Sequence, residues 1–152
     1  MSKAIVIFAC IFSMCVKPPE HVAVSDKSVA AYANSIRSEN VNVLSIGGFY
    51  FQSLVEKLYL DLEYKGVLSD YVAKKMITSY VKGLLTHINQ DASLKGFLVK
   101  ERFYEEDISV SLSFTSEEGK SSQVHIHNHE VIFSTYNGET NQLIKNYSAP
   151  LH

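Results

Sequence analysis

The chain has 152 residues, a formal net charge of -2, and hydrophobic residues at 46% of its positions. This length suits a single domain, and the apolar content, with 8 Phe and 9 Tyr, excludes a wholly disordered chain. The balance of 14 Lys and Arg against 16 Asp and Glu excludes a polycationic nucleic-acid-binding protein, so no nucleic-acid partner is expected.

The N-terminal segment has the pattern of an export signal. Lys3 precedes the apolar run Ala4–Val16, which is shorter than the roughly 20 residues of a membrane-spanning helix. Pro18 and Pro19 then end the run. The alternative is that this run forms a buried N-terminal strand or helix. We predict a signal peptide or lipoprotein signal at residues 1–15, a tether at 16–27, and a single α+β domain at 28–152.

Both cysteines of the chain, Cys10 and Cys15, lie within this run, which excludes a disulfide framework in the folded part. A cysteine at the end of such a run is typical of bacterial lipoproteins, in which the acylated thiol anchors the protein to a membrane. Cys15 is the candidate lipidation site because it stands just before the proline-containing spacer. A cleaved secretory signal stays open, because Met14 occupies a position that normally holds a small residue.

Two segments have the apolar spacing of amphipathic helices. The first is predicted at about 28–39, where Val29, Tyr32 and Ile36 recur at helical spacing. The second is longer, at about 70–89, and begins after the capping residue Ser69. Its predicted apolar stripe consists of Val72, Met76, Tyr80, Leu84 and Ile88, with Ile77, Val81 and Leu85 beside it.

Alternating polar and apolar residues predict a mostly antiparallel sheet, and the fold class is therefore α+β, with the helices packed on one face of the sheet. Leu58 and Leu62 also fit a helix, because they are four residues apart. Gly47-Gly48 is expected to form a turn or bulge. The strands are predicted near residues 41–46, 54–64, 107–115, 122–128 and 130–136, with a less regular one at 142–147.

Several short motifs suggest a relationship. They are Lys17–His21 after the cysteine, Ser45–Gly48, His87–Asn89, and the strand at 108–114. Together they resemble a family of small exported proteins and lipoproteins of chlamydia-like intracellular bacteria. The resemblance extends over most of the chain and implies export with lipid anchoring at Cys15. It implies no catalytic or binding residue, because no function is established for that family.

The most distinctive polar motif is the run of alternating histidines that ends the fourth predicted strand, His125, His127 and His129. On one continuous strand their side chains would project from the same face at steps of about 7 Å. Neutral imidazole binds zinc, copper and nickel, and three histidines form a known zinc site. The simpler interpretation places the first two on the solvated face of the strand and the third in a turn.

The other charged residues do not form a catalytic or nucleic-acid-binding motif. Glu105 and Glu106 are adjacent in a charge-rich link, and Lys74, Lys75 and Lys82 form the polar side of the long helix. No phosphate-binding loop or nucleophile motif is present, so no cofactor is expected. We predict a non-enzymatic, exported or lipid-anchored module that contacts an unidentified protein partner and reaches the membrane through Cys15. The alternative is a metal-binding or metal-dependent protein that uses the three histidines.

Overall fold

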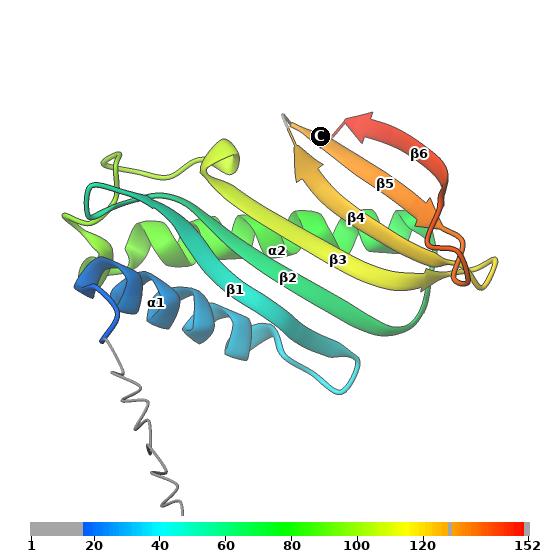
Figure 1. Ribbon diagram of the computed structural model, residues 1–152, viewed down its shortest axis with the longest axis horizontal. Coiled ribbons are helices and arrows are strands. Elements are labelled where there is room, and N and C mark those ends of the chain that lie inside the picture. Colours follow the sequence, from blue (N-terminus) through cyan, green and yellow to red (C-terminus); the bar gives the residue numbers. More distant parts are fainter. Residues whose placement is uncertain (1–16, 128, 151–152) are drawn as a thin grey trace, which may run out of the picture.

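The computed structural model describes residues 17–127 and 129–150, in which two α-helices pack on a six-stranded sheet (Figure 1). The helices are α1 (Glu20–Ile36) and α2 (Asp70–Gln90), followed by the short 3-10 helices η1 (Ala92–Leu94) and η2 (Glu105–Asp107). The strands are β1 (Val41–Phe51), β2 (Leu54–Leu68), β3 (Ile108–Ser116), β4 (Ser121–His127), β5 (Glu130–Tyr136) and β6 (Leu143–Pro150).

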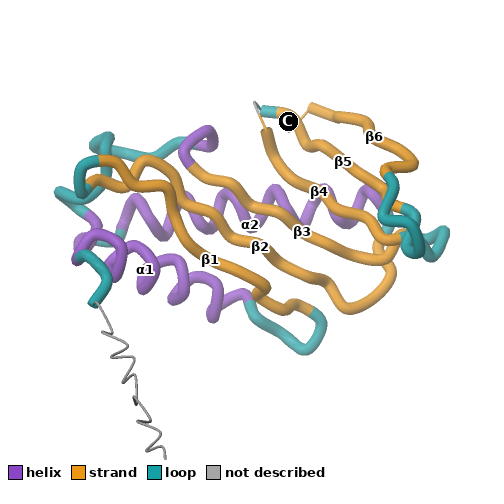
Figure 2. The backbone as a smooth tube through the Cα atoms, viewed as in Figure 1, coloured by secondary structure: helices purple, strands orange, loops and turns teal. Residues whose placement is uncertain are grey.

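The strands lie in the sheet in the same order as in the chain, from β1 to β6. All neighbouring pairs are antiparallel except β2 and β3, which are parallel and are connected through α2. The tube in Figure 2 shows α2 crossing behind the strands as it makes this connection. The predicted α+β class with a mostly antiparallel sheet is therefore confirmed.

The core lies between the helices and one face of the sheet. Leu58, Leu60 and Leu62 of β2 are fully buried, which confirms strand periodicity over the competing helix in this segment. Opposite them, α2 buries a stripe that consists of Ala73, Ile77, Val81, Leu84 and Ile88. The predicted stripe is thus rotated by about one residue, and Val72 is 40% exposed. Both helices pack on this one face, so no described helix covers the opposite face of the sheet.

Helix α1 begins eight residues before its predicted start, so it takes up most of the segment predicted as a tether. Pro19 stands at the N-cap, where a missing backbone N–H costs nothing. Ser25 and Ser28, which stand near the predicted start, are buried inside the helix. Ser25 Oγ donates to the carbonyl of Val22 and also lies 3.1 Å from the hydroxyl of Tyr50 on β1. These two contacts, and not a capping role at the start of the helix, explain why a polar residue stands at position 25.

Strand β1 continues through the two glycines that were predicted to form a turn or bulge. A Cβ at Gly47 would lie 2.4 Å from the hydroxyl oxygen of Tyr59, and one at Gly48 would lie 2.9 Å from the carbonyl oxygen of Lys57. A side chain at Gly48 would meet cross-strand backbone, and one at Gly47 would displace the ring of Tyr59, so glycine suits both positions. The irregularities in this hairpin fall on either side, after Val43 and after Phe49.

The remaining elements lie close to their predicted positions. Ser69 caps α2 by accepting a hydrogen bond of 3.4 Å from the N–H of Val72. The least regular predicted strand is β6, which forms the exposed edge of the sheet and runs three residues farther than expected. No helix in the described part of the chain is long and apolar enough to cross a membrane.

Candidate functional site

The candidate site is the face of the sheet that no described helix covers, and Figure 1 views the molecule from this side, with α2 behind the strands. The strand registers align short polar side chains in rows across this face. We call this side of the sheet, which no described helix covers, the open face. Its central row consists of Ser45, Asp61, Ser111 and His125, and a second row consists of Asn42, Glu63, Ser113, Gln123 and Ser134.

The central row is held together by one carboxylate. Ser111 Oγ donates to Asp61 Oδ1 at 2.6 Å, and Ser45 Oγ donates to Asp61 Oδ2 at 2.5 Å. Ser111 is only 8% exposed, although no described helix lies over it, because its cross-strand neighbours shield it. The row therefore joins three strands and has a fixed arrangement before any partner arrives.

This row contains the residue types of a serine hydrolase but not their arrangement. In a catalytic triad the histidine lies between the serine and the carboxylate and accepts the serine proton. Here the hydroxyl of Ser111 donates its hydrogen bond to Asp61 directly, and His125 lies on the far side of Ser111. A serine bonded in this way is not activated as a nucleophile by a neighbouring histidine.

His125 is half-buried in β4, between Ser111 on β3 and Ile132 on β5. This burial lowers the pKa of its imidazole, and the nearby His127 lowers it further. The ring is therefore neutral at physiological pH and can both donate and accept a hydrogen bond on the open face.

The other two histidines lie at one end of the sheet. Strand β4 ends at His127, and His129 occupies a turn with φ 63°, so the three histidines do not share one continuous strand. His129 Nδ1 lies 3.1 Å from Glu105 Oε2, which comes from η2. These two residues contribute to the lining of a cavity of about 340 Å³, together with Lys57, Glu106, Ile108, Ile126 and His127.

Within residues 17–127 and 129–150, no group of three or more His, Cys, Asp or Glu side chains is placed to hold a metal ion. The metal hypothesis therefore still depends on the sequence pattern alone. Cys15, the predicted lipidation site, lies outside the described residues.

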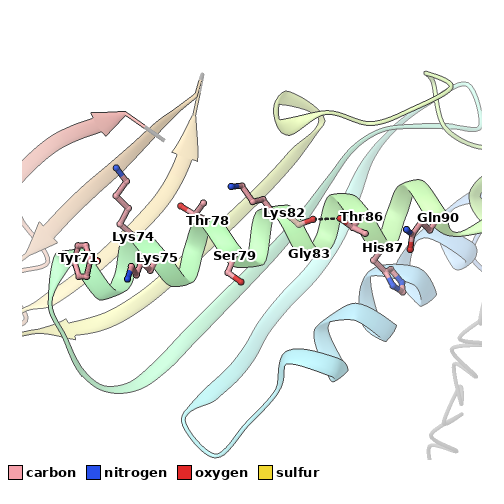
Figure 3. Close-up of a pocket in the computed structure, with 10 residues that line it drawn as sticks. All are labelled: Tyr71, Lys74, Lys75, Thr78, Ser79, Lys82, Gly83, Thr86, His87 and Gln90. Carbon is pink, nitrogen blue, oxygen red and sulfur yellow. Dashed lines mark hydrogen bonds between the residues drawn. The ribbon is translucent and has the colours of Figure 1, made fainter. Parts of the chain in front are cut away.

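The three lysines of α2 line a groove along the outer side of that helix. Figure 3 shows that the side chains diverge: Lys74 and Lys82 point to one side of α2, whereas His87 points to the other, toward α1. The Nζ of Lys74 donates to the carbonyl of Pro150, and the Nζ of Lys75 lies 4.6 Å from the ring centroid of Tyr71. Because these side chains do not converge on one point, the groove offers no enclosed anion site.

No known protein family, curated protein or solved structure matches this chain. Reasoning from the sequence did not identify Asp61, Ser111 or the pairing of Glu105 with His129, because each depends on strand register or on a contact between distant segments.

Proposed function

We propose that this protein is an exported, non-enzymatic module that binds a protein partner on the open face of its sheet. The observation that carries this proposal is the central row, in which Asp61 accepts hydrogen bonds from Ser45 and Ser111. The row presents a surface of short side chains whose positions are already fixed, so a partner would lose little side-chain entropy in binding.

The composition of the open face supports a protein partner over a small molecule. Its polar atoms are distributed over several strands, and they do not converge in a deep apolar cavity of the kind that small ligands prefer. A broad, hydrogen-bonding surface of this type suits a protein contact in which direct and water-mediated bonds are distributed over the interface.

Attachment to the envelope is the second part of the proposal. It is supported by the apolar run Ala4–Val16, by Cys15 at its end, and by the resemblance to exported lipoproteins of chlamydia-like bacteria. Only residues 16–19 separate Cys15 from Glu20, the first residue of α1, and the five steps between them span at most about 18 Å. An acyl chain on Cys15 would therefore hold the domain close to the membrane surface.

Blocking the open face tests the binding proposal. Ser113→Arg places a long charged side chain in the second row, and Ser79→Arg places the same side chain on the exposed side of α2 as a matched control. The full chain, expressed with an affinity tag and purified from cells, should lose its co-purifying partner with Ser113→Arg and keep it with Ser79→Arg. Loss with both variants or with neither would contradict the proposal.

Metabolic labelling tests the anchor. A bacterium that expresses the full chain in the presence of labelled palmitate should incorporate label into the wild-type protein and the Cys10→Ser variant but not into Cys15→Ser. Label that persists in Cys15→Ser, or that never appears, would overturn lipid anchoring at this residue without affecting the binding proposal.

A further inference from the structure

The tip of the β1–β2 hairpin exposes large apolar side chains. Phe49 is 59% exposed and Phe51 is 56% exposed, and both lie on the opposite side of β1 from the inward-facing Tyr50. A neighbouring segment extends this surface, because Val55 and Leu98 form a β-bridge that brings Val99, 42% exposed, beside the hairpin. We call Phe49, Phe51 and Val99 the tip patch.

The tip patch lies at the end of the domain where the chain enters it. The ring of His21, in the first turn of α1, is 5.3 Å from the ring of Tyr50 and packs edge-on against it. The hydroxyl of Tyr50 also donates to Asp26 Oδ1 at 3.2 Å. In Figure 1 the hairpin and the start of α1 lie together at the left end, whereas β6 begins at the right.

We infer that the tip patch contacts the lipid surface to which the N-terminal segment attaches the protein. This inference rests on the proposed anchoring. The short spacer at residues 16–19 places the membrane next to the start of α1, and the exposed phenylalanines lie at that same end. Apolar side chains that meet the boundary between headgroups and acyl chains gain from burial there, and a second attachment of this kind stabilises a single lipid anchor.

The segment that contains Val99 also carries basic side chains. The segment at residues 95–102 carries Lys95, Lys100 and Arg102 against the single acid Glu101. Lys100 is paired with Asp107 at 2.6 Å, and the other two basic side chains extend from exposed positions. Basic residues near exposed apolar ones suit an anionic headgroup region, and the exposed acid Glu56 of β2 offsets part of this charge.

Tryptophan reporters test this contact, because the chain contains no tryptophan of its own. Phe51→Trp places the reporter in the tip patch. Leu143→Trp is the matched control, since Leu143 is 53% exposed and begins β6 at the other end of the molecule. Helix α2 alone is about 30 Å long, so the control lies far from any lipid contact at the tip.

The full-length variants, purified from bacterial membranes, are added to vesicles of phosphatidylcholine and phosphatidylglycerol. The emission of Phe51→Trp should shift to the blue, and brominated acyl chains should quench it, whereas the emission of Leu143→Trp should not change. Co-sedimentation with the vesicles records attachment separately. A Phe49→Ser, Phe51→Ser double variant with an unchanged far-UV circular dichroism spectrum should bind the vesicles more weakly than wild type.

The outcomes separate this inference from the proposal on which it rests. Co-sedimentation without quenching of Phe51→Trp would overturn the lipid contact of the tip patch and leave the anchor intact. Failure of the full chain to co-sediment would overturn the anchor and the inference together. A blue shift that appears without vesicles and grows with protein concentration would show that a second copy covers the patch, which would also overturn the inference.

Discussion

Ser111 on β3 donates a hydrogen bond of 2.6 Å to Asp61 on β2, across the parallel strand pair of the sheet. The same carboxylate accepts a second bond from Ser45 on β1, so a single acidic side chain joins three strands on the open face. In this protein the acid and the two hydroxyls hold one another in place on the open face.

Replacing Asp61 with alanine should destabilise the fold, because Ser111 is buried and would lose its acceptor. Hydrogen bonds to a charged group are each worth about 1.5–3 kcal/mol, and we expect a loss of about 2 kcal/mol in the free energy of unfolding. Asp61→Asn keeps a carbonyl oxygen as acceptor and should lose less. Urea denaturation measures both variants, and an unchanged midpoint for Asp61→Ala would contradict the role given to this carboxylate.

Gly83 on α2 lies against Tyr32 on α1, and a Cβ at this position would be 2.4 Å from the tyrosine hydroxyl oxygen. That hydroxyl donates to the carbonyl of Tyr80 at 2.9 Å, and burial raises the pKa of Tyr32 to about 12. Gly83→Ala should therefore destabilise the protein, although alanine is intrinsically favoured in a helix by about 1 kcal/mol.

The Gly83→Ala prediction has an internal control. In the Tyr32→Phe background the obstructing hydroxyl is absent, so Gly83→Ala should cost less there than in the wild-type chain, which a double-mutant cycle measures. A stabilising effect of Gly83→Ala in the wild-type background would show that the helices are farther apart than the structure places them.

His125 should make the protein less stable in acid. Burial lowers the pKa of His125 in the folded state, so the unfolded chain binds more protons once the pH falls below about 6.5. The free energy of unfolding should therefore decrease as the pH is lowered from about 7.5 to about 5. His125→Gln removes this contribution and should have a shallower acid slope. Equal slopes for the two proteins in denaturation series would contradict the partial burial of this ring.

The metal hypothesis makes an opposing prediction that calorimetry can decide. Because the structure separates the three histidines between a strand and a turn, we expect zinc and copper to bind the full chain no tighter than micromolar. Replacing His125, His127 and His129 together with alanine should leave the titration unchanged. Tight binding that this triple variant abolishes would favour the metal-binding alternative over the proposed binding module.

The regular elements were predictable because their signals are local. The alternation of Leu58, Leu60 and Leu62 with polar residues specified β2, and Ser69 before a long apolar periodicity specified the start of α2. Each of these patterns comes from residues within a few positions of one another. Because one side of the strand or helix is buried, the apolar residues keep the period of that element. The α+β class follows from the order of such segments.

The sequence-based predictions were wrong at residues that contact a segment distant in the sequence. The first helix was predicted to start at about residue 28, but α1 begins at Glu20 and buries the hydroxyl of Ser25 beside that of Tyr50. Gly47 suggests a turn, but it remains inside β1 because the ring of Tyr59 covers it. The central row depends on the same kind of information, because the contact of Ser111 with Asp61 requires the register of a parallel pair whose strands are joined through a helix.

The most direct test of the central claim is site-specific photo-crosslinking in cells that produce the full chain. A photoreactive amino acid at Gln123, which belongs to the second row of the open face, should give a discrete adduct with one partner protein. The same amino acid at Ser79, on the exposed side of α2, should give none. Adducts from Ser79 alone, or from neither position, would contradict the proposal that the open face is the binding surface.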